Sequence, residues 1–154
     1  MPILETRRLV WTDEVQCAES ANAMAAKPAV RSACIELHGD LGAGKTTFAR
    51  HLLGALGVIG RVKSPTYAIM EPYALDGFDA WHFDFYRFND AEEFEDAGFR
   101  EVFASPGLKL VEWPDKAASL LPEADLVVTI AFDTNEQRDV SFTAQSALGL
   151  GLLP

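Results

Sequence analysis

The stretch HGDLGAGKTT, residues 38–47, contains the pattern that decides the fold of this chain. Gly39, Gly44, Lys45 and Thr46 satisfy G-x-x-x-x-G-K-T, which is the spacing of a phosphate-binding P-loop. The glycines let the backbone curl so that successive N–H groups point into one concavity, and the following helix adds the partial positive charge of its N-terminus. In such a loop the lysine reaches the β and γ phosphates, and the threonine hydroxyl is a ligand of Mg²⁺. The stretch therefore predicts a nucleotide-binding loop.

The residues on either side of this stretch have the patterns that a P-loop requires. SACIELH, residues 32–38, is predicted to be a strand, and residues 45–56 are predicted to form a helix that Gly57 ends. The alternative is a glycine-rich turn that only starts a helix, but such a turn has no need of a lysine and a threonine at these positions. The predicted nucleotide-binding residues of the loop are Gly39, Asp40, Leu41, Gly42, Ala43, Gly44, Lys45, Thr46 and Thr47.

Strand and helix patterns alternate along the rest of the chain. Asp13, with Gln16 three residues later, is similar to a capping box and predicts a helix that runs to about residue 26. The other predicted strands are 8–11, 67–73, 80–86, 108–112, 126–131 and 140–142, and the other predicted helices are 90–97 and 115–121.

This order indicates the fold class. No repeat, low-complexity linker or composition break interrupts it, so we predict a single domain over residues 1–154. The predicted class is α/β, a single-domain P-loop NTPase-like sandwich with a central, mainly parallel sheet flanked by helices. The C-terminal tail, about residues 146–154, is predicted to fray.

Composition and charge exclude several classes of function. The net charge is −10 and the sequence pI is about 4.6, the reverse of the basic footprint of a nucleic-acid-binding protein, so any contact with RNA is expected to pass through a partner. A local cluster of backbone N–H groups can still bind a small polyanion. Two cysteines are too few for a disulfide framework, and no apolar run approaches the ~20 residues that span a bilayer. We therefore expect a cytoplasmic protein without a membrane contact.

A P-loop also needs an acidic residue for the metal, usually at the C-terminal end of a neighbouring strand. Asp84 closes the run WHFD and Glu112 closes LKLVE, so either carboxylate is a candidate. The alternatives are a solvated edge carboxylate for Asp84 and a helix cap before Pro114 for Glu112. His82 alternates with Asp84 on one strand face, which is compatible with a functional role, but the pattern alone favours a satisfied core or surface histidine.

The stretch VKSPTY, residues 62–67, lies where nucleotide hydrolases place a mobile loop that senses the γ phosphate. Thr66 is a candidate metal contact there, while Ser64 and Pro65 also fit an ordinary turn before a strand.

Two features are absent from the sequence. It has no N-K-x-D-like element for reading guanine, which disfavours a guanine-specific switch. It also has few arginines in its second half, since only Arg87, Arg100 and Arg138 follow residues 62–67. An arginine finger accelerates hydrolysis by ~10³- to 10⁵-fold. Without an obvious one, the isolated chain is expected to hydrolyse nucleotide slowly and to be stimulated by a partner.

Four motifs, GDLGAGKTTFAR, VKSPTY, HFDFYR and VEWP, occur in an order that resembles the TsaE family, also called YjeE. Its members are small bacterial ATPases of tRNA threonylcarbamoyladenosine biosynthesis, and the resemblance spans about residues 31–142. It implies that ATP or ADP and Mg²⁺ are the ligands of the loop. The site residues that it implies are Thr46 and Glu112 at the metal, Trp113 close to the nucleotide, Ser64, Pro65 and Thr66 as a switch, and Lys45, Thr66 and Asp84 in catalysis.

The resemblance also implies partners. It predicts association with the TsaB and TsaD proteins, of which TsaD transfers the threonylcarbamoyl group, so tRNA would be contacted only through them. Two other classes stay open at this point. A small P-loop kinase would phosphorylate a metabolite or nucleoside, and a nucleotide-gated binding module would work without useful hydrolysis.

Overall fold

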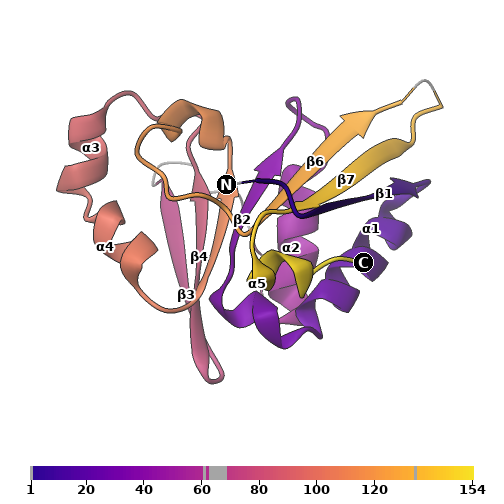
Figure 1. Ribbon diagram of the computed structural model, residues 1–154, viewed down its shortest axis with the longest axis horizontal. Helices are drawn as coiled ribbons and strands as arrows, with labels where there is room; N and C mark the ends of the chain where they lie inside the picture. The colour runs from indigo at the N-terminus through magenta and orange to yellow at the C-terminus, as the bar shows by residue number, and fades with distance from the viewer. Residues whose placement is uncertain (1, 61, 63–68, 134) are drawn as a thin grey trace.

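The computed structural model describes residues 2–60, 62, 69–133 and 135–154. In these residues one sheet of seven strands runs through the molecule in the order β1-β7-β6-β2-β5-β4-β3 (Figure 1). The strands are β1 Glu5–Trp11, β2 Cys34–His38, β3 Met70–Leu75, β4 Phe78–Asp84, β5 Leu108–Glu112, β6 Leu126–Phe132 and β7 Arg138–Ala144.

The centre of the sheet is parallel and its flanks are antiparallel. Strands β6, β2, β5 and β4 run in the same direction, whereas β1, β7 and β3 each pair antiparallel with their neighbours. Two of the flanking strands belong to hairpins, β3–β4 and β6–β7, whose short turns can join only antiparallel strands, and the N-terminal strand β1 pairs with β7 at the edge of the sheet. The predicted α/β class is confirmed, and the predicted parallel sheet is found at its centre, around β2.

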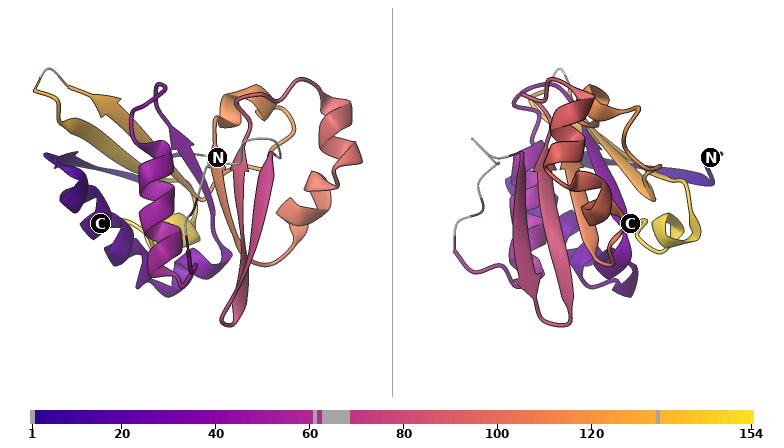
Figure 2. Two further views of the ribbon diagram at one scale, coloured as in Figure 1. Left: turned by 180° about the vertical axis from the view of Figure 1, so that it is seen from behind. Right: turned by 90° about the vertical axis from the view of Figure 1, so that its left-hand side faces the viewer.

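Helices lie on both sides of the sheet, as Figures 1 and 2 show. Helices α1 and α2 pack against each other behind the sheet of Figure 1, and α3 and α4 lie beside β4 and β5. No helix in the described part of the chain is long and apolar enough to cross a bilayer. The helices are α1 Glu14–Ala25, α2 Lys45–Ala55, α3 Ala91–Asp96, α4 Phe99–Ala104 and α5 Ala147–Leu150, with 3₁₀ turns η1 Pro28–Ser32 and η2 Pro114–Ala117.

Successive residues of β5 enter two different hydrophobic cores. Leu110 belongs to the core beneath α1 and α2, while Val111 belongs to a second core that contains Phe83, Phe85 and Phe99. The alternation follows from strand geometry, because neighbouring side chains point to opposite faces. The next residue of β5, Glu112, therefore shares the face of Leu110 and points toward α2.

The predicted start of the first helix is present. Asp13 caps α1 by accepting a hydrogen bond from the backbone N–H of Gln16 at 3.0 Å. The Gln16 side chain reaches back and accepts from the backbone N–H of Thr12 at 2.7 Å, so the reciprocal pair resembles a capping box shifted by one residue.

The prediction that the C-terminal tail frays is wrong. Residues Ala147–Leu150 form α5, and Ser146 caps this helix by accepting from the Gly149 N–H at 3.1 Å. Beyond the helix, the side chains of Leu152 and Leu153 are 1% and 6% exposed and belong to the core beneath α1 and α2. The leucines of the tail therefore supply apolar area that the sequence pattern, with its glycines, did not reveal.

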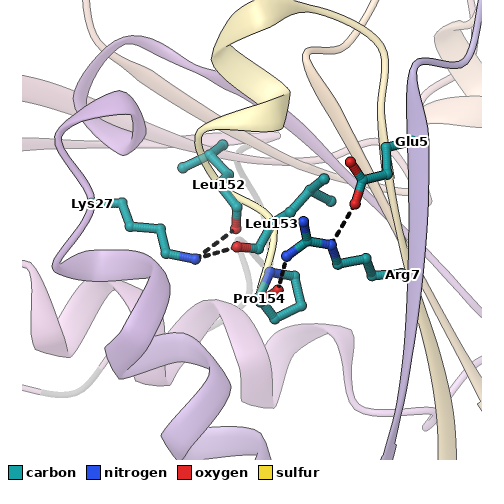
Figure 3. A network of polar contacts seen from close by, with 6 residues as sticks. All are labelled: Glu5, Arg7, Lys27, Leu152, Leu153 and Pro154. Atoms are coloured by element: carbon teal, nitrogen blue, oxygen red, sulfur yellow. Dashed lines mark hydrogen bonds and ion pairs between the residues drawn. The ribbon is translucent and has the colours of Figure 1, made fainter.

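Cationic side chains also hold the end of the chain (Figure 3). Lys27 donates to the carbonyl oxygens of Leu152, at 3.4 Å, and of Leu153. Arg7 donates to the carbonyl oxygen of Pro154 and pairs with Glu5 at 2.5 Å. The tail is thus fixed between β1 and the segment that follows α1.

Truncating a tail leucine should destabilise the whole fold. We expect Leu152→Ala to lower the free energy of unfolding by ~2–5 kcal/mol, because it leaves a cavity in the core. The matched control is Leu150→Ala, since Leu150 is 42% exposed and its truncation should change stability by less than ~0.5 kcal/mol. Urea unfolding followed by circular dichroism measures both values, and equal stabilities of the two variants would contradict the packing of the tail.

Candidate functional site

The glycine loop lies between the end of β2 and the start of α2, and its backbone needs glycine. Gly39, Gly42 and Gly44 have φ angles of 151°, 81° and 117°, which side chains rarely allow. At Gly39 a Cβ atom would also lie 2.4 Å from the carbonyl oxygen of Ile130 in β6. The loop therefore packs directly on the neighbouring strand, and its conformation depends on the first glycine.

Lys45 is buried inside the loop, with 5% of its surface exposed. Its ammonium donates to the carbonyl oxygens of Gly39 and of Asp40, the latter at 3.1 Å, and lies 4.0 Å from the centre of the Trp113 ring. Burial lowers the pKa of Lys45, and the neighbouring carboxylates, of which Glu112 has the largest effect, oppose this shift. The loop thus holds a desolvated cation among oxygen atoms and one aromatic face.

Glu112 reaches the loop because β5 pairs with β2 and sets it level with Leu37. Its carboxylate is 2% exposed; Oε1 accepts from the Thr46 hydroxyl at 2.8 Å, and Oε2 lies 2.6 Å from Nε2 of His82. The two predicted metal ligands are therefore in direct contact. The alternative, a helix-capping role for Glu112, is not observed, since Trp113 occupies the cap position of η2.

Asp84 lies beside Glu112 rather than in its place. The parallel register of β4 and β5 pairs these two residues, and Asp84 accepts from the backbone N–H of Tyr86 at 3.0 Å. Both acids line a cavity of about 320 Å³, which we call the P-loop cavity, together with Lys45, Thr46 and Trp113. The strand pattern alone left the choice between the two acids open, while the family resemblance implied Glu112 at the metal; the structure brings both acids to one cavity.

The donor atoms at this cavity suit a hard divalent cation. A hydroxyl and a carboxylate are oxygen ligands of the kind that Mg²⁺ prefers, and Mg²⁺ usually takes its remaining ligands from water and substrate phosphates. The described residues contain no cluster of three or more His, Cys, Asp or Glu side chains that could hold a metal unaided. Thr46 and Glu112 therefore fit a metal that arrives with a phosphate ligand.

A second cavity, of about 210 Å³, adjoins the other side of the loop, and we call it the α1 cavity. Thr12 and Arg138 are among its lining residues, and Gly44 and Thr47 line both cavities. Arg138 donates from Nε to the carbonyl oxygen of Ala43 at 2.8 Å, so β7 holds the loop from this side. No local pattern in the sequence pointed to these residues, because only the pairing of β1 with β7 brings Thr12 and Arg138 together.

His82 makes a contact that its pattern did not predict. The pattern favoured a satisfied core or surface histidine; the ring is fully buried, as in a core histidine, and it contacts the carboxylate of Glu112. The signal that was available is the alternation of His82 with Asp84, which puts both residues on the strand face shared with Glu112. The remaining predicted residues, Ser64, Pro65 and Thr66, lie outside the described residues.

Comparison with known proteins gives matches over most of the chain. The family model described as "Threonylcarbamoyl adenosine biosynthesis protein TsaE" matches residues 11–140. A protein of Haemophilus influenzae called tRNA threonylcarbamoyladenosine biosynthesis protein TsaE is 43% identical over 119 residues, which cover 77% of this chain and 75% of that protein. The protein of the same name from Bacillus subtilis is 36% identical over 137 residues, covering 89% and 84%.

The fold also matches a solved structure. The crystal structure of Bacillus subtilis YdiB superposes with a TM-score of 0.79 at 27% sequence identity and covers 99% of this chain and 94% of that one. The resemblance that the four sequence motifs indicated is confirmed by these matches.

Adding one methyl group to the first loop glycine should destabilise the fold. We expect Gly39→Ala to cost ~1–3 kcal/mol, because its positive φ and the contact with Ile130 both oppose a side chain. Gly54→Ala is the matched control; Gly54 lies in α2 with open space around it, so alanine should stabilise the helix by ~0.5–1 kcal/mol. Chemical denaturation compares the two, and a neutral Gly39→Ala variant would contradict the proposed constraint.

Proposed function

The chain belongs to the TsaE family, and from this membership and the geometry of the loop we propose that it is an ATPase that binds Mg-ATP. The role of the family is in tRNA threonylcarbamoyladenosine biosynthesis, and we assign the same process to this chain. The observation that carries the proposal is the contact of Thr46 with Glu112 beside the buried ammonium of Lys45.

The loop is the phosphate-binding part of the proposed site. Its backbone N–H groups and the N-terminus of α2 offer donors and positive charge to a polyphosphate. Lys45 now donates to two backbone carbonyl oxygens of the loop. In the proposed complex it donates instead to the β and γ phosphates, which are charged acceptors and form the stronger hydrogen bonds.

The acidic side of the P-loop cavity has two roles in this proposal. Thr46 and Glu112 would hold Mg²⁺, which neutralises charge on the phosphates when it is bound. Asp84, which lines the same cavity, is proposed to orient the attacking water as a Walker B-like acid. The cofactors are thus ATP or ADP and Mg²⁺.

The nucleoside is assigned to the α1 cavity. Gly44 and Thr47 line both cavities, so a ligand whose phosphates lie in the P-loop cavity can pass its ribose and base across these residues. Trp11 and Cys17 give the α1 cavity apolar walls, and Thr12 offers polar atoms to a base edge.

Slow hydrolysis by the isolated chain follows from the distribution of cations. Of the described residues that line the P-loop cavity, Lys45 is the only basic one. Arg138 is bound to the Ala43 carbonyl, and Arg100 is paired with Glu95. A partner that supplies a cation would accelerate the reaction, and we propose the TsaB and TsaD proteins as partners. With a net charge of −10 on this chain, tRNA would be contacted only through them.

The kinase alternative has less support. A small kinase needs a basic lid, yet the segment between β4 and β5, residues 85–107, contains only two basic side chains, Arg87 and Arg100. Its helices α3 and α4 instead bury Phe94 and Phe99 in the second core. This segment is built for packing, so the ATPase is the better assignment.

Nucleotide binding should change the fluorescence of Trp113. The Lys45 ammonium lies over its ring, and we expect ADP with Mg²⁺ to draw the ammonium away. In a Trp11→Phe background, Trp113→Phe should abolish the response. Trp81→Phe is the matched control, because Trp81 also has a lysine over its ring, Lys109 at 5.4 Å. It should keep the response, because Trp81 does not line the P-loop cavity. A response that survives Trp113→Phe would contradict the assignment.

Phosphate release from ATP should be slow for the chain alone and faster with purified TsaB and TsaD. An added cationic group is worth up to ~10³- to 10⁵-fold in rate.

Lys45→Ala should weaken nucleotide binding by ~1.5–3 kcal/mol, roughly 10- to 150-fold, because a charged hydrogen-bond donor is lost. Asp84→Ala should slow phosphate release while binding persists.

A malachite-green assay for phosphate, run beside calorimetry with Mg-ATP, measures these effects. Fast turnover by the isolated chain, or no stimulation by the two partners, would contradict the partner-dependent ATPase. Appearance of a phosphorylated metabolite or nucleoside in the products would favour the kinase.

A further inference from the structure

The carboxylate of Glu112 is held from two sides, and only one side belongs to the loop. Oε1 accepts from the hydroxyl of Thr46 at 2.8 Å, and Oε2 lies 2.6 Å from Nε2 of His82. His82 is fully buried and Glu112 is 2% exposed, so the contact between these two side chains is shielded from water, whereas Thr46 and Glu112 meet at the wall of the P-loop cavity. The histidine comes from β4, on the far side of β5 from the loop.

The chemistry of the pair assigns the direction of this hydrogen bond. A carboxylate only accepts, so Nε2 of His82 is the donor, and a neutral ring then leaves Nδ1 as an acceptor. Nδ1 is buried and has no hydrogen-bond partner among the described residues. Buried polar atoms are normally satisfied, so an apolar side chain would suit this position better if packing were its only task. The histidine is therefore explained by its contact with Glu112.

We propose that His82 is a positioning residue for the metal-binding carboxylate. By holding Oε2, it fixes the rotation of the Glu112 carboxylate and keeps Oε1 directed at Thr46 and the cation that these residues would share. The inference rests on the proposed function of Thr46 and Glu112. In this proposal His82 raises the affinity for the metal through Glu112 and does not contact the nucleotide.

Removing the His82 side chain should lower the affinity for the metal and leave the metal-free affinity for the nucleotide unchanged. Groups that hydrogen-bond to a metal ligand contribute about 10- to 100-fold to metal affinity. Without His82, Oε2 would be buried without its donor, and the carboxylate could turn toward Thr46 with either oxygen. The contacts of Lys45 with the loop do not involve His82, so ADP should bind as before when no Mg²⁺ is present.

The test is calorimetric titration of the full chain with ADP, once with Mg²⁺ and once with EDTA. The ratio of the two dissociation constants measures how strongly Mg²⁺ enhances ADP binding. We expect His82→Leu to reduce this ratio about 10-fold or more and to leave binding in EDTA unchanged. His82→Gln should restore most of the ratio, since its amide nitrogen can donate to Oε2 from a similar distance along the side chain.

A matched control lies on the adjacent part of the sheet. His38 also pairs with a glutamate, Nε2 to Oε1 of Glu36 at 2.9 Å, but its side chain is 28% exposed and Glu36, unlike Glu112, does not line the P-loop cavity. His38→Gln should leave the ratio unchanged. In a Glu112→Gln background, His82→Leu should have no further effect, because two residues that act through one contact are not additive.

The outcomes separate this inference from the proposed function. If the natural chain shows no enhancement by Mg²⁺, both fail. If it does and folded His82→Leu keeps the full ratio, or loses affinity equally in EDTA, only the positioning role fails. Should His82→Leu not fold, the same comparison is made with His82→Gln and His82→Asn, which differ in the reach of their amide; equal ratios in these two variants would also overturn it.

Discussion

A carboxylate buried as deeply as that of Glu112 has to be paired, and its two partners tie together the elements that form the site. Thr46 lies in the first turn of α2, His82 belongs to β4, and Glu112 ends β5. The parallel register makes the arrangement possible, because it sets Glu112 level with Leu37 on one side and with Asp84 on the other. Displacing any one of these three elements would therefore deprive the buried carboxylate of at least one of its two donors, so the core and the site are held by the same contacts.

Lys45 is subject to a related constraint. Its ammonium is desolvated, which lowers its pKa, and the nearby carboxylates only partly offset that cost. Carbonyl oxygens of Gly39 and Asp40 and the face of Trp113 satisfy it in this structure. These are neutral partners, so a phosphate oxygen would be a better acceptor for the same donor. The loop thus holds its cation in an environment that favours exchange with an anionic ligand.

The features that could be predicted from the sequence are those that depend on neighbouring residues in the chain. The glycine loop and the Asp13 cap depend on residues a few positions apart, and the structure contains both. Contacts between distant segments explain the rest. Whether Asp84 or Glu112 reaches Thr46 depends on strand order, which no local pattern encodes. The contact of Arg138 with the loop depends on the pairing of β6 with both β2 and β7, and the order of the tail depends on Lys27, more than a hundred residues away.

The strong negative charge of the chain is compatible with a phosphate ligand because the two act over different distances. Fields from exposed carboxylates are screened over ~8 Å at physiological salt, whereas the loop donors and Lys45 act at contact distance in a partly desolvated site. A long polyanion such as RNA would meet many exposed acids at once and few cations. The proposed nucleotide would meet mainly the loop. The same charge distribution therefore admits the small phosphate ligand, disfavours direct binding of nucleic acid, and favours partners that carry basic groups.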